Sequence, residues 1–220
     1  MKLKVMSYNI RHGQGIGKIY SLKAIAEVIR RENPDIVGLN EVYQIHHLLD
    51  QPNKLSKMLG MNYVFQANVS YGYFGGYGNL ILSKCKILKS DSIKLPRVVG
   101  IETRGLLLSE ILLDDKKISF GTTHLGLRII DRSSQILSLK EIIKDNSPII
   151  LCGDFNGSVS ELKPLFSDYK LAGEYKTYHS NNPKKQFDYI LSSKNISLCS
   201  SKVINSKASD HLPIVAEYII

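Results

Sequence analysis

The chain has few cysteines and no long apolar segment, and both absences exclude classes of protein. No run approaches the roughly 18 consecutive apolar residues of a membrane-spanning helix. The start, Met1 to Lys4, leads into a short strand-like run without the apolar core of a signal peptide, so we expect no export by that route. Three cysteines are an odd number without paired spacing, and Cys152 lies inside an apolar run. A buried, reduced thiol and a cytoplasmic location are therefore expected.

Internal repeats, low-complexity tracts and a long linker are also missing. A chain of 220 residues can bury a large core, so we expect a single domain over residues 1–220. Lys and Arg total 29 against 20 Asp and Glu, which gives a net charge of +9. This excess favours polyanionic partners: nucleic acid, anionic lipid surfaces or phosphorylated small molecules. Charge alone does not choose among them.

The first forty residues predict a strand, a helix and a second strand. Ser21 precedes a run whose apolar residues share one helical face, and Asn33-Pro34 ends it. An apolar strand pattern then leads to Glu41. A βαβ-like unit of this kind brings Asn9 and Glu41 to the same end of one sheet.

The rest of the chain alternates strand patterns with two further helices. One helix surrounds Leu55 and Leu59 and is closed by Gly60, and the other opens at Ser134. A loop rich in Gly and Tyr, residues 71–77, separates two strand-like runs, and its tyrosines suit either a loop or stacking on a base or sugar. The expected strands are 63–65, 80–82, 106–113, 118–123, 149–153, 189–191 and 214–220, with 106–113 and 118–123 antiparallel. Mixed strands with few helices between them predict two packed sheets with helices outside.

Six segments place acids, amides or histidines after apolar runs or in short polar motifs. They carry Asn9, Glu41, His124, Asp154 with Asn156, Asp188, and Asp210 with His211. In five of the six the polar residue ends a β-branched or leucine-rich run, where a buried strand emerges into a loop. Together they predict a metal-dependent phosphoesterase site in a common cleft.

In motifs, order and spacing the chain resembles the endonuclease/exonuclease/phosphatase superfamily from Asn9 to His211. Its members include DNase I-like nucleases, abasic-site endonucleases, inositol-polyphosphate phosphatases and neutral sphingomyelinases. The resemblance implies a four-layer α/β/β/α sandwich of two packed mixed β-sheets flanked by helices. It also implies an active site where strand ends meet.

The acids Glu41 and Asp210 and the amide Asn9 are the expected metal group. A glutamate carboxylate suits Mg²⁺ or Mn²⁺, which bind few protein groups and keep several waters. Asn9 offers a carbonyl oxygen to the metal or an amide to phosphate, and by resemblance it is an active-site residue. Asp210 is similar to a family acid that binds metal or positions a histidine.

The expected catalytic residues are Asp154, Asn156, Asp188, His211 and His124. Asp154 and Asn156 are two positions apart, so an extended backbone points both to one side, one toward the attacking water and the other toward a phosphate oxygen. Asp188 is expected to orient His211 and raise its basicity. Whether His211 takes a proton from water or stays protonated against the phosphate is open. His124 is the second phosphate-facing histidine, which neutralises charge or serves the leaving group.

Two further residues are expected to contact substrate. Arg104 resembles a family arginine whose planar fork suits a phosphate. Asn79 stands where DNase I-like members have a glutamate paired with a histidine. Six cations beside the motifs form an expected phosphate-binding rim or, alternatively, ordinary solvated charge: Arg11, Lys18, Arg128, Arg132, Lys184 and Lys185.

The leading hypothesis is therefore a monomeric, divalent-metal-dependent hydrolase of phosphodiester bonds in DNA or RNA, with water as the nucleophile. The first alternative is the same chemistry on a phospholipid head group or an inositol or sugar phosphate, since a fold does not set its substrate. A second alternative, a silent nucleic-acid-binding protein, predicts the loss of a metal or acid residue. None of Glu41, Asp154, Asp188, Asp210 and His211 is missing.

Overall fold

Two mixed β-sheets form the centre of the computed structural model, which describes residues 1–45, 49–165 and 167–220. The first sheet has the strand order β12-β13-β1-β2-β5-β4, with β3 beside β2. Its strands are β1 (Lys2–Asn9), β2 (Ile36–Ile45), β3 (Leu49–Asp50), β4 (Asn62–Ser70), β5 (Gly75–Ser83), β12 (Ser197–Val203) and β13 (Ile214–Ile219). The second sheet has the order β10-β11-β9-β8-β7-β6. Its strands are β6 (Lys86–Lys94), β7 (Gly105–Leu113), β8 (Lys116–His124), β9 (Ile149–Asp154), β10 (Tyr169–Leu171) and β11 (Asp188–Ser193).

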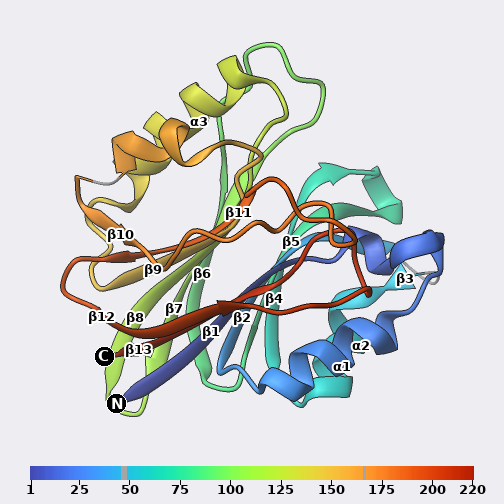
Figure 1. Cartoon of the computed structure of the whole chain (residues 1–220), viewed down its shortest axis with the longest axis horizontal. Coiled ribbons are helices and arrows are strands. Elements are labelled where there is room, and N and C mark those ends of the chain that lie inside the picture. Colours follow the sequence, from blue (N-terminus) through green and yellow to red (C-terminus); the bar gives the residue numbers. More distant parts are fainter. Residues whose placement is uncertain (46–48, 166) are drawn as a thin grey trace.

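Three helices cover the outer faces, so the chain forms the expected α/β/β/α sandwich (Figure 1). Helices α1 (Leu22–Glu32) and α2 (Gln51–Leu59) pack on the first sheet, while α3 (Ile129–Ile143) and the 3-10 helix η4 (Val159–Leu165) pack on the second. A third core cluster lies between the sheets and includes Phe120, Ile150 and Cys152. Burial raises the pKa of the Cys152 thiol to about 12, as expected for an inert core residue.

The predicted start of the fold is confirmed. Strands β1 and β2 are parallel, with Asn9 opposite Asn40, and α1 crosses between them. The Ser21 hydroxyl accepts a hydrogen bond from the Ala24 amide at 3.1 Å, and Asn33 ends α1 in the left-handed conformation. Gly60 ends α2 in the same way, and β7 and β8 are antiparallel as predicted.

Two expectations about the elements were wrong or incomplete. Helix α3 begins at Ile129, not at Ser134, because its first turn is fixed by contacts with a distant loop. Strands β6, β10 and β12 were not predicted. All three lie at sheet edges, and their mixed polar sequences lack the apolar run of a buried strand.

No helix in the part of the chain that the structure describes is long and apolar enough to cross a membrane. The polar ends of the central strands, by contrast, meet at one end of the sandwich. Strands β1, β8 and β9 finish there at Asn9, His124 and Asp154. Strand β11 begins there at Asp188, which pairs with Asp154 in the register of the second sheet.

Candidate active site

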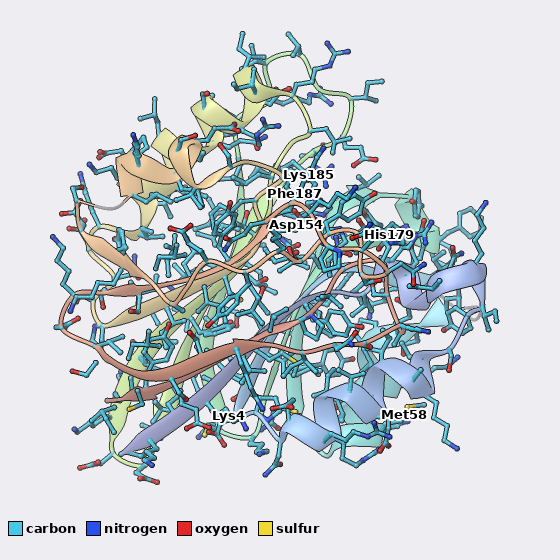
Figure 2. All side chains as sticks on the ribbon, in the orientation of Figure 1. Lys4, Met58, Asp154, His179, Lys185 and Phe187 are labelled. Atoms are coloured by element: carbon cyan, nitrogen blue, oxygen red, sulfur yellow. The ribbon has the colours of Figure 1, made fainter. Side chains whose placement is uncertain are left out.

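A cleft of about 460 Å³ opens where these strand ends meet. It is lined by seven of the residues that the sequence singles out: Glu41, Arg104, His124, Asp154, Asn156, Asp210 and His211. Asn9 and Asp188 lie directly behind this wall, and both are fully buried. Figure 2 shows Asp154 between the two sheets, with Phe187 and Lys185 nearby.

The backbone is strained around this cleft. Glu41 has a φ of 59° and lies in a register shift of β2 between Leu39 and Val42. Asn156 has a φ of 51°, and Arg11 and His12 also have positive φ values. Residues other than glycine rarely adopt this conformation, and such strain concentrates at functional sites. Here it turns the Glu41 and Asn156 side chains toward the cleft instead of along the strand.

Gly153 is required for the last step of β9 toward Asp154. Its φ is 140°, and a Cβ atom there would lie 1.9 Å from the Thr123 carbonyl oxygen. Only glycine fits this approach of β9 to β8. Asn40 then fixes the next residue, because its Oδ1 accepts a hydrogen bond from the Asp154 amide at 3.0 Å.

Asp188, His211 and Asp154 form a continuous chain of polar contacts. The Nδ1 of His211 lies 2.8 Å from Asp188 Oδ2, and its Nε2 lies 3.7 Å from Asp154 Oδ2. Asp188 is completely buried. With Nδ1 held by Asp188, the Nε2 edge of His211 is directed at Asp154 and the cleft.

Two members of this chain, Asp154 and His211, have raised pKa values. Burial raises the pKa of Asp154 to about 7, although the nearby His211 charge and the Asn9 amide oppose the shift. Burial alone lowers the pKa of His211, but the charges of Asp188 and Asp154 outweigh it and raise the pKa to about 10. At neutral pH, His211 is the charged imidazole of the site, and Asp154 is a carboxyl group close to its midpoint.

His124 is the opposite case. Burial, followed by the charges of Arg104 and His211, holds its pKa well below the usual value. The Asn156 amide donates to the Leu125 carbonyl at 3.0 Å and lies 2.9 Å from His124 Nε2. Because an amide nitrogen donates, Nε2 accepts, which fits a neutral ring.

The carboxylates of Glu41 and Asp210 fit a hard divalent cation, whereas Asn9 turns its amide nitrogen to this side and its Oδ1 accepts from the Arg11 amide at 3.0 Å. Glu41 and Asp210 line the cleft with half-buried carboxylates, and the Asn9 amide bridges Glu41 Oε1 at 3.0 Å and Asp154 Oδ2 at 2.9 Å. Cationic or basic groups face both acids: His12 Nε2 is 3.3 Å from Glu41 Oε2, and Arg11 Nε is 3.3 Å from Asp210 Oδ2. A few carboxylates that line an open cleft suit Mg²⁺ or Mn²⁺.

A second possible metal group overlaps the catalytic chain. Ligand atoms of Asp154, Asp188 and His211 all lie within 4.8 Å of one another. However, the hydrogen bond between His211 Nδ1 and Asp188 occupies two of these ligands. The carboxylates of Glu41 and Asp210 lie outside this hydrogen bond and line the cleft, where Arg11 and His12 contact them.

Of the two residues expected to contact substrate, one lies in the cleft and the other does not. Arg104 lines the cleft, and its Nη2 lies 2.8 Å from Glu102 Oε2. Asn79 does not reach the cleft, which corrects the expectation that it touches substrate. It is fully buried, donates to the Gly105 carbonyl at 2.9 Å, and accepts from Asn40 at 2.9 Å. Its amide therefore supports Asn40, which in turn holds Asp154.

The comparisons with known proteins agree with this geometry. The model of the endonuclease/exonuclease/phosphatase family matches residues 6–211. The chain belongs to the endonuclease/exonuclease/phosphatase family. It is thus a phosphoesterase of that superfamily, and no curated protein sequence matches it closely enough to assign a substrate.

Solved structures show the same fold at low sequence identity. A mannosyl-6-phosphatase from Bacteroides thetaiotaomicron has a TM-score of 0.86 at 19% identity, covering 99% of this chain and 100% of its own. The catalytic domain of human Nocturnin, with a bound sulfate anion, has a TM-score of 0.79 at 22% identity, covering 99% and 93%. Humanized TDP2 from D. rerio has a TM-score of 0.80 at 20% identity, covering 100% and 99%. These relatives share the architecture of this phosphoesterase.

Several cleft residues of this phosphoesterase were missed by the sequence analysis. They are His12, Glu102, Tyr178 and Phe187, while Tyr77, from the Tyr-rich segment 71–77, also lines the cleft. His12 stacks on Tyr43 with ring centroids 4.4 Å apart and contacts Glu41. Its place directly after the Asn9 motif was the one available signal, whereas Glu102, Tyr178 and Phe187 come from loops whose path no local pattern fixes.

The expected rim of six cations needs one clear correction. Arg132 belongs to α3 and is buried, with Nε and Nη2 both 2.8 Å from Glu161 Oε2. It therefore cannot serve as a free phosphate contact. Arg11 faces Asp210, while Lys184 and Lys185 remain exposed beside Phe187.

Proposed function

We propose that this phosphoesterase is a divalent-metal-dependent hydrolase of phosphodiester bonds, with DNA or RNA as its leading substrate and water as its nucleophile. One observation carries the proposal. The paired Asp188 and His211, the Asp154 carboxyl and the Glu41 carboxylate all converge on one cleft.

The residues divide the work of hydrolysis. Glu41, with Asn9 and Asp210, would hold Mg²⁺ or Mn²⁺, and the bound cation would neutralise charge on the phosphoryl oxygen. Asp154, whose pKa is raised to about 7, would orient the attacking water and accept its proton near neutral pH. The charged His211 and Arg104 would face the phosphate. The neutral His124 would act as a hydrogen-bonding partner of phosphate or leaving group.

A basic groove supports nucleic acid as the substrate. A cavity of about 800 Å³ shares Leu127, Asn156 and Phe187 with the cleft. Three exposed lysines line it: Lys176, Lys184 and Lys185. A chain of phosphates that leaves the cleft along this groove would meet all three charges.

A second candidate substrate is the phosphorylated head group of a lipid, or an inositol or sugar phosphate. The observation that favours a lipid is a group of exposed aliphatic side chains at the mouth of the cleft.

We also propose that residues 1–220 act as one domain, as a monomer and in the cytoplasm. Size-exclusion chromatography with light scattering tests the oligomeric state.

The chemistry is tested with Glu41→Gln, which removes charge but little volume. We expect turnover to fall about a hundredfold or more, the scale of losing a main electrostatic stabiliser. The exposed Glu141→Gln is the control and should keep full activity. The assay panel contains single- and double-stranded DNA, RNA, abasic DNA, inositol phosphates and sphingomyelin with Mg²⁺ or Mn²⁺. Hydrolysis that resists chelators, or normal turnover by folded Glu41→Gln, contradicts the proposal.

The substrate is tested by the salt dependence of oligonucleotide binding to Asp154→Asn. Affinity should fall log-linearly with salt, and Lys184→Gln/Lys185→Gln should flatten the slope by about 0.7 per lysine for a single strand. Lys116→Gln/Lys117→Gln, at the start of β8, removes the same charge far from the groove. If no oligonucleotide binds at low salt while a lipid or sugar phosphate is cleaved, nucleic acid is the wrong substrate.

A further inference from the structure

Two loops beside the cleft expose aliphatic side chains. They are residues 95–104, between β6 and β7, and residues 125–130, which lead into and begin α3; the two protrude together at the top of Figure 1. Between 49% and 92% of each of six side chains is exposed: Val98, Val99, Ile101, Leu127, Ile129 and Ile130. We call these six residues the aliphatic crest. Contiguous apolar surface of this kind is uncommon on monomeric proteins and marks an interaction site.

The crest is built by turning polar side chains inward. Asp131 is 2% exposed, and its Oδ1 accepts hydrogen bonds from the amides of Val98 at 2.6 Å and Val99 at 3.1 Å. Gln135 is 1% exposed; it donates to the Pro96 carbonyl at 3.0 Å and accepts from the Gly126 amide at 2.8 Å. Two polar groups of α3 thus fasten both loops, and the aliphatic side chains are left facing outward.

The charge around the crest is positive. Arg97 and Arg128 are exposed, and Arg97 Nη1 also donates to the Ile101 carbonyl at 3.0 Å. The acids of the two loops and the following turn are already paired, because Glu102 contacts Arg104 and Asp131 accepts backbone amides. With a net charge of +9, this surface complements an anionic one.

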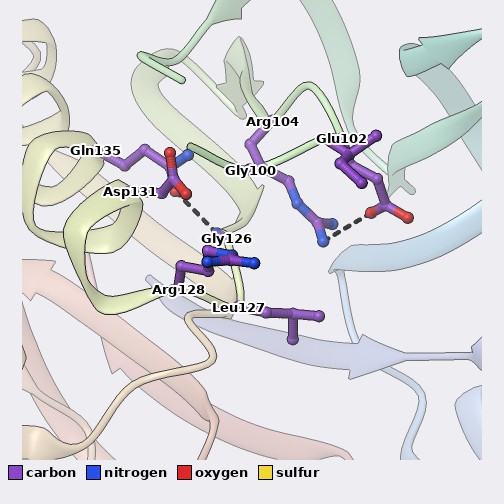
Figure 3. A pocket seen from close by; sticks show the side chains of 9 residues that line it. Gly100, Glu102, Arg104, Gly126, Leu127, Arg128, Asp131 and Gln135 are labelled. Carbon is purple, nitrogen blue, oxygen red and sulfur yellow. Dashed lines mark hydrogen bonds and ion pairs between the residues drawn. The ribbon is translucent and has the colours of Figure 1, made fainter. Parts of the chain in front are cut away.

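A cavity of about 240 Å³ joins the crest to the catalytic cleft (Figure 3). Ile101 and Leu127 line it, as do Arg128 and the backbone of Gly100. It shares Glu102, Arg104 and Leu127 with the cleft. A surface that covers the crest would therefore lie directly beside the phosphate-facing Arg104.

We propose that the aliphatic crest docks the protein on an anionic lipid surface. Its aliphatic side chains would enter the boundary between head groups and acyl chains, while Arg97 and Arg128 stay with the lipid phosphates. The catalytic cleft would then face the head groups. Binding by this surface does not depend on the proposed reaction and is measured without turnover.

The other occupants explain fewer of the observations. Proteins bind nucleic acid through cationic side chains and through planar groups that stack on bases. The branched aliphatic side chains of the crest supply neither kind of contact. A second copy of the chain would bring Arg97 and Arg128 against their own like charges, whereas anionic lipid satisfies the aliphatic and the cationic groups together.

The first experiment measures how much protein sediments with lipid vesicles in the presence of a chelator. The vesicles contain phosphatidylcholine, with or without phosphatidylglycerol. The crest variant is Ile101→Ser/Ile129→Ser, since neither residue lines the catalytic cleft. The control, Met58→Ser/Leu137→Ser, removes exposed apolar groups from α2 and from farther along α3. We expect wild type and control to bind the anionic vesicles. The affinity of the crest variant for these vesicles should be lower by about tenfold or more. Hydrolysis of a small soluble phosphodiester should be equal in all three.

The second experiment uses the absence of tryptophan in this chain. Ile101→Trp introduces one fluorophore at the most exposed crest position, and Leu137→Trp is the control. Anionic vesicles should shift the emission of Ile101→Trp to shorter wavelength and leave Leu137→Trp unchanged. This reading holds whether or not the serine variant folds.

Three results overturn the proposal. They are absence of vesicle binding by wild type at low salt, equal binding by the crest variant, and a concentration-dependent dimer in light scattering that the crest variant abolishes. The last result would make the crest an interface between copies. Normal hydrolysis of the soluble phosphodiester by Glu41→Gln, together with intact vesicle binding, would contradict only the proposed reaction.

Discussion

The acidity of individual side chains at the cleft is set by their neighbours more than by their type. Two histidines, His124 and His211, lie on either side of Asp154, at 3.6 Å and 3.7 Å from its Oδ2. Burial, followed by the charge of Arg104, lowers the pKa of His124, whereas the charges of Asp188 and Asp154 outweigh burial and raise the pKa of His211. The opposite shifts make His211 the positively charged ring and His124 a neutral ring that forms hydrogen bonds.

We predict that these opposite shifts are visible in a titration of the metal-free protein. A lowered pKa means that His124 takes up its proton only at lower pH, so its ring stays neutral at pH values around the ordinary histidine pKa of about 6.5. A raised pKa, about 10, means that His211 keeps its proton above neutral pH. Ring-nitrogen NMR with His124→Asn and His211→Asn for assignment measures both. Two rings that titrate together near the ordinary value contradict the prediction.

The contact between Asp188 and His211 leads to a second prediction at this scale. If Asp188 acts through its 2.8 Å contact with His211, the losses of Asp188→Asn and His211→Ala in kcat should not multiply. The double variant should be about as slow as the slower single variant. Asp188→Asn combined with the distant Lys117→Gln is the matched comparison and should show independent effects. Fully multiplicative losses in the first pair count against the pairing.

At the scale of the elements, the site depends on how two sheets bring strand ends together. The parallel pair β8 and β9 places His124 opposite Asp154, and β11 adds Asp188. Gly153 permits this arrangement because no side chain fits between β9 and the Thr123 carbonyl. The stability of the second sheet and the position of Asp154 therefore rest on the same residue.

We predict that Gly153→Ala destabilises the protein by about 3 kcal/mol or more, from the combined backbone strain and overlap. Gly17→Ala is the control, since Gly17 also has a positive φ, 79°, but has nothing within 4 Å of the added methyl group. It should cost only about 1 kcal/mol. Urea unfolding of both variants measures the difference. Equal losses would show that the close approach to Thr123 contributes nothing.

Sequence patterns predicted the buried elements and missed those that only the tertiary structure defines. The apolar runs gave β1, β2, β8, β9 and β11, since a strand covered on both faces is apolar throughout. The edge strands β6, β10 and β12 have mixed sequences, so no period distinguished them from loops. Helix α3 starts early because Asp131 is bonded to Val98 and Val99, more than thirty residues away.

The same limit applies to the candidate site. Motif residues at strand ends, such as Glu41 and Asp154, could be located because each strand fixes its own end. Phe187 and Tyr178 could not, because they enter the cleft from loops. Asn79 was placed in the cleft from its motif alone, whereas the structure gives its amide a buried partner, Asn40.

At the scale of the whole molecule, the facing surfaces of the two sheets form a buried core. Cys152 lies in this core and is fully buried. Gly38 of the opposite sheet packs closely against it, since a Cβ added at Gly38 would lie 2.4 Å from Cys152 Sγ. Cys199 is exposed on the edge strand β12. Cys152 and Cys199 therefore differ in how deeply they are buried in the same structure.

We predict that a thiol reagent labels Cys199 rapidly and Cys152 only after global unfolding. Burial raises the pKa of the Cys152 thiol to about 12, so almost no thiolate forms at neutral pH, and the packed sheets exclude the reagent. Because Cys152 packs between the two sheets, we expect them to separate before the reagent reaches its sulfur, so the labelling rate of Cys152 should follow urea with the slope of the global unfolding transition. Mass spectrometry of peptides after timed labelling measures each site, and Cys199→Ser removes the fast phase as a control. Labelling of Cys152 at a rate independent of urea would mean that the two sheets separate locally without unfolding of the whole chain.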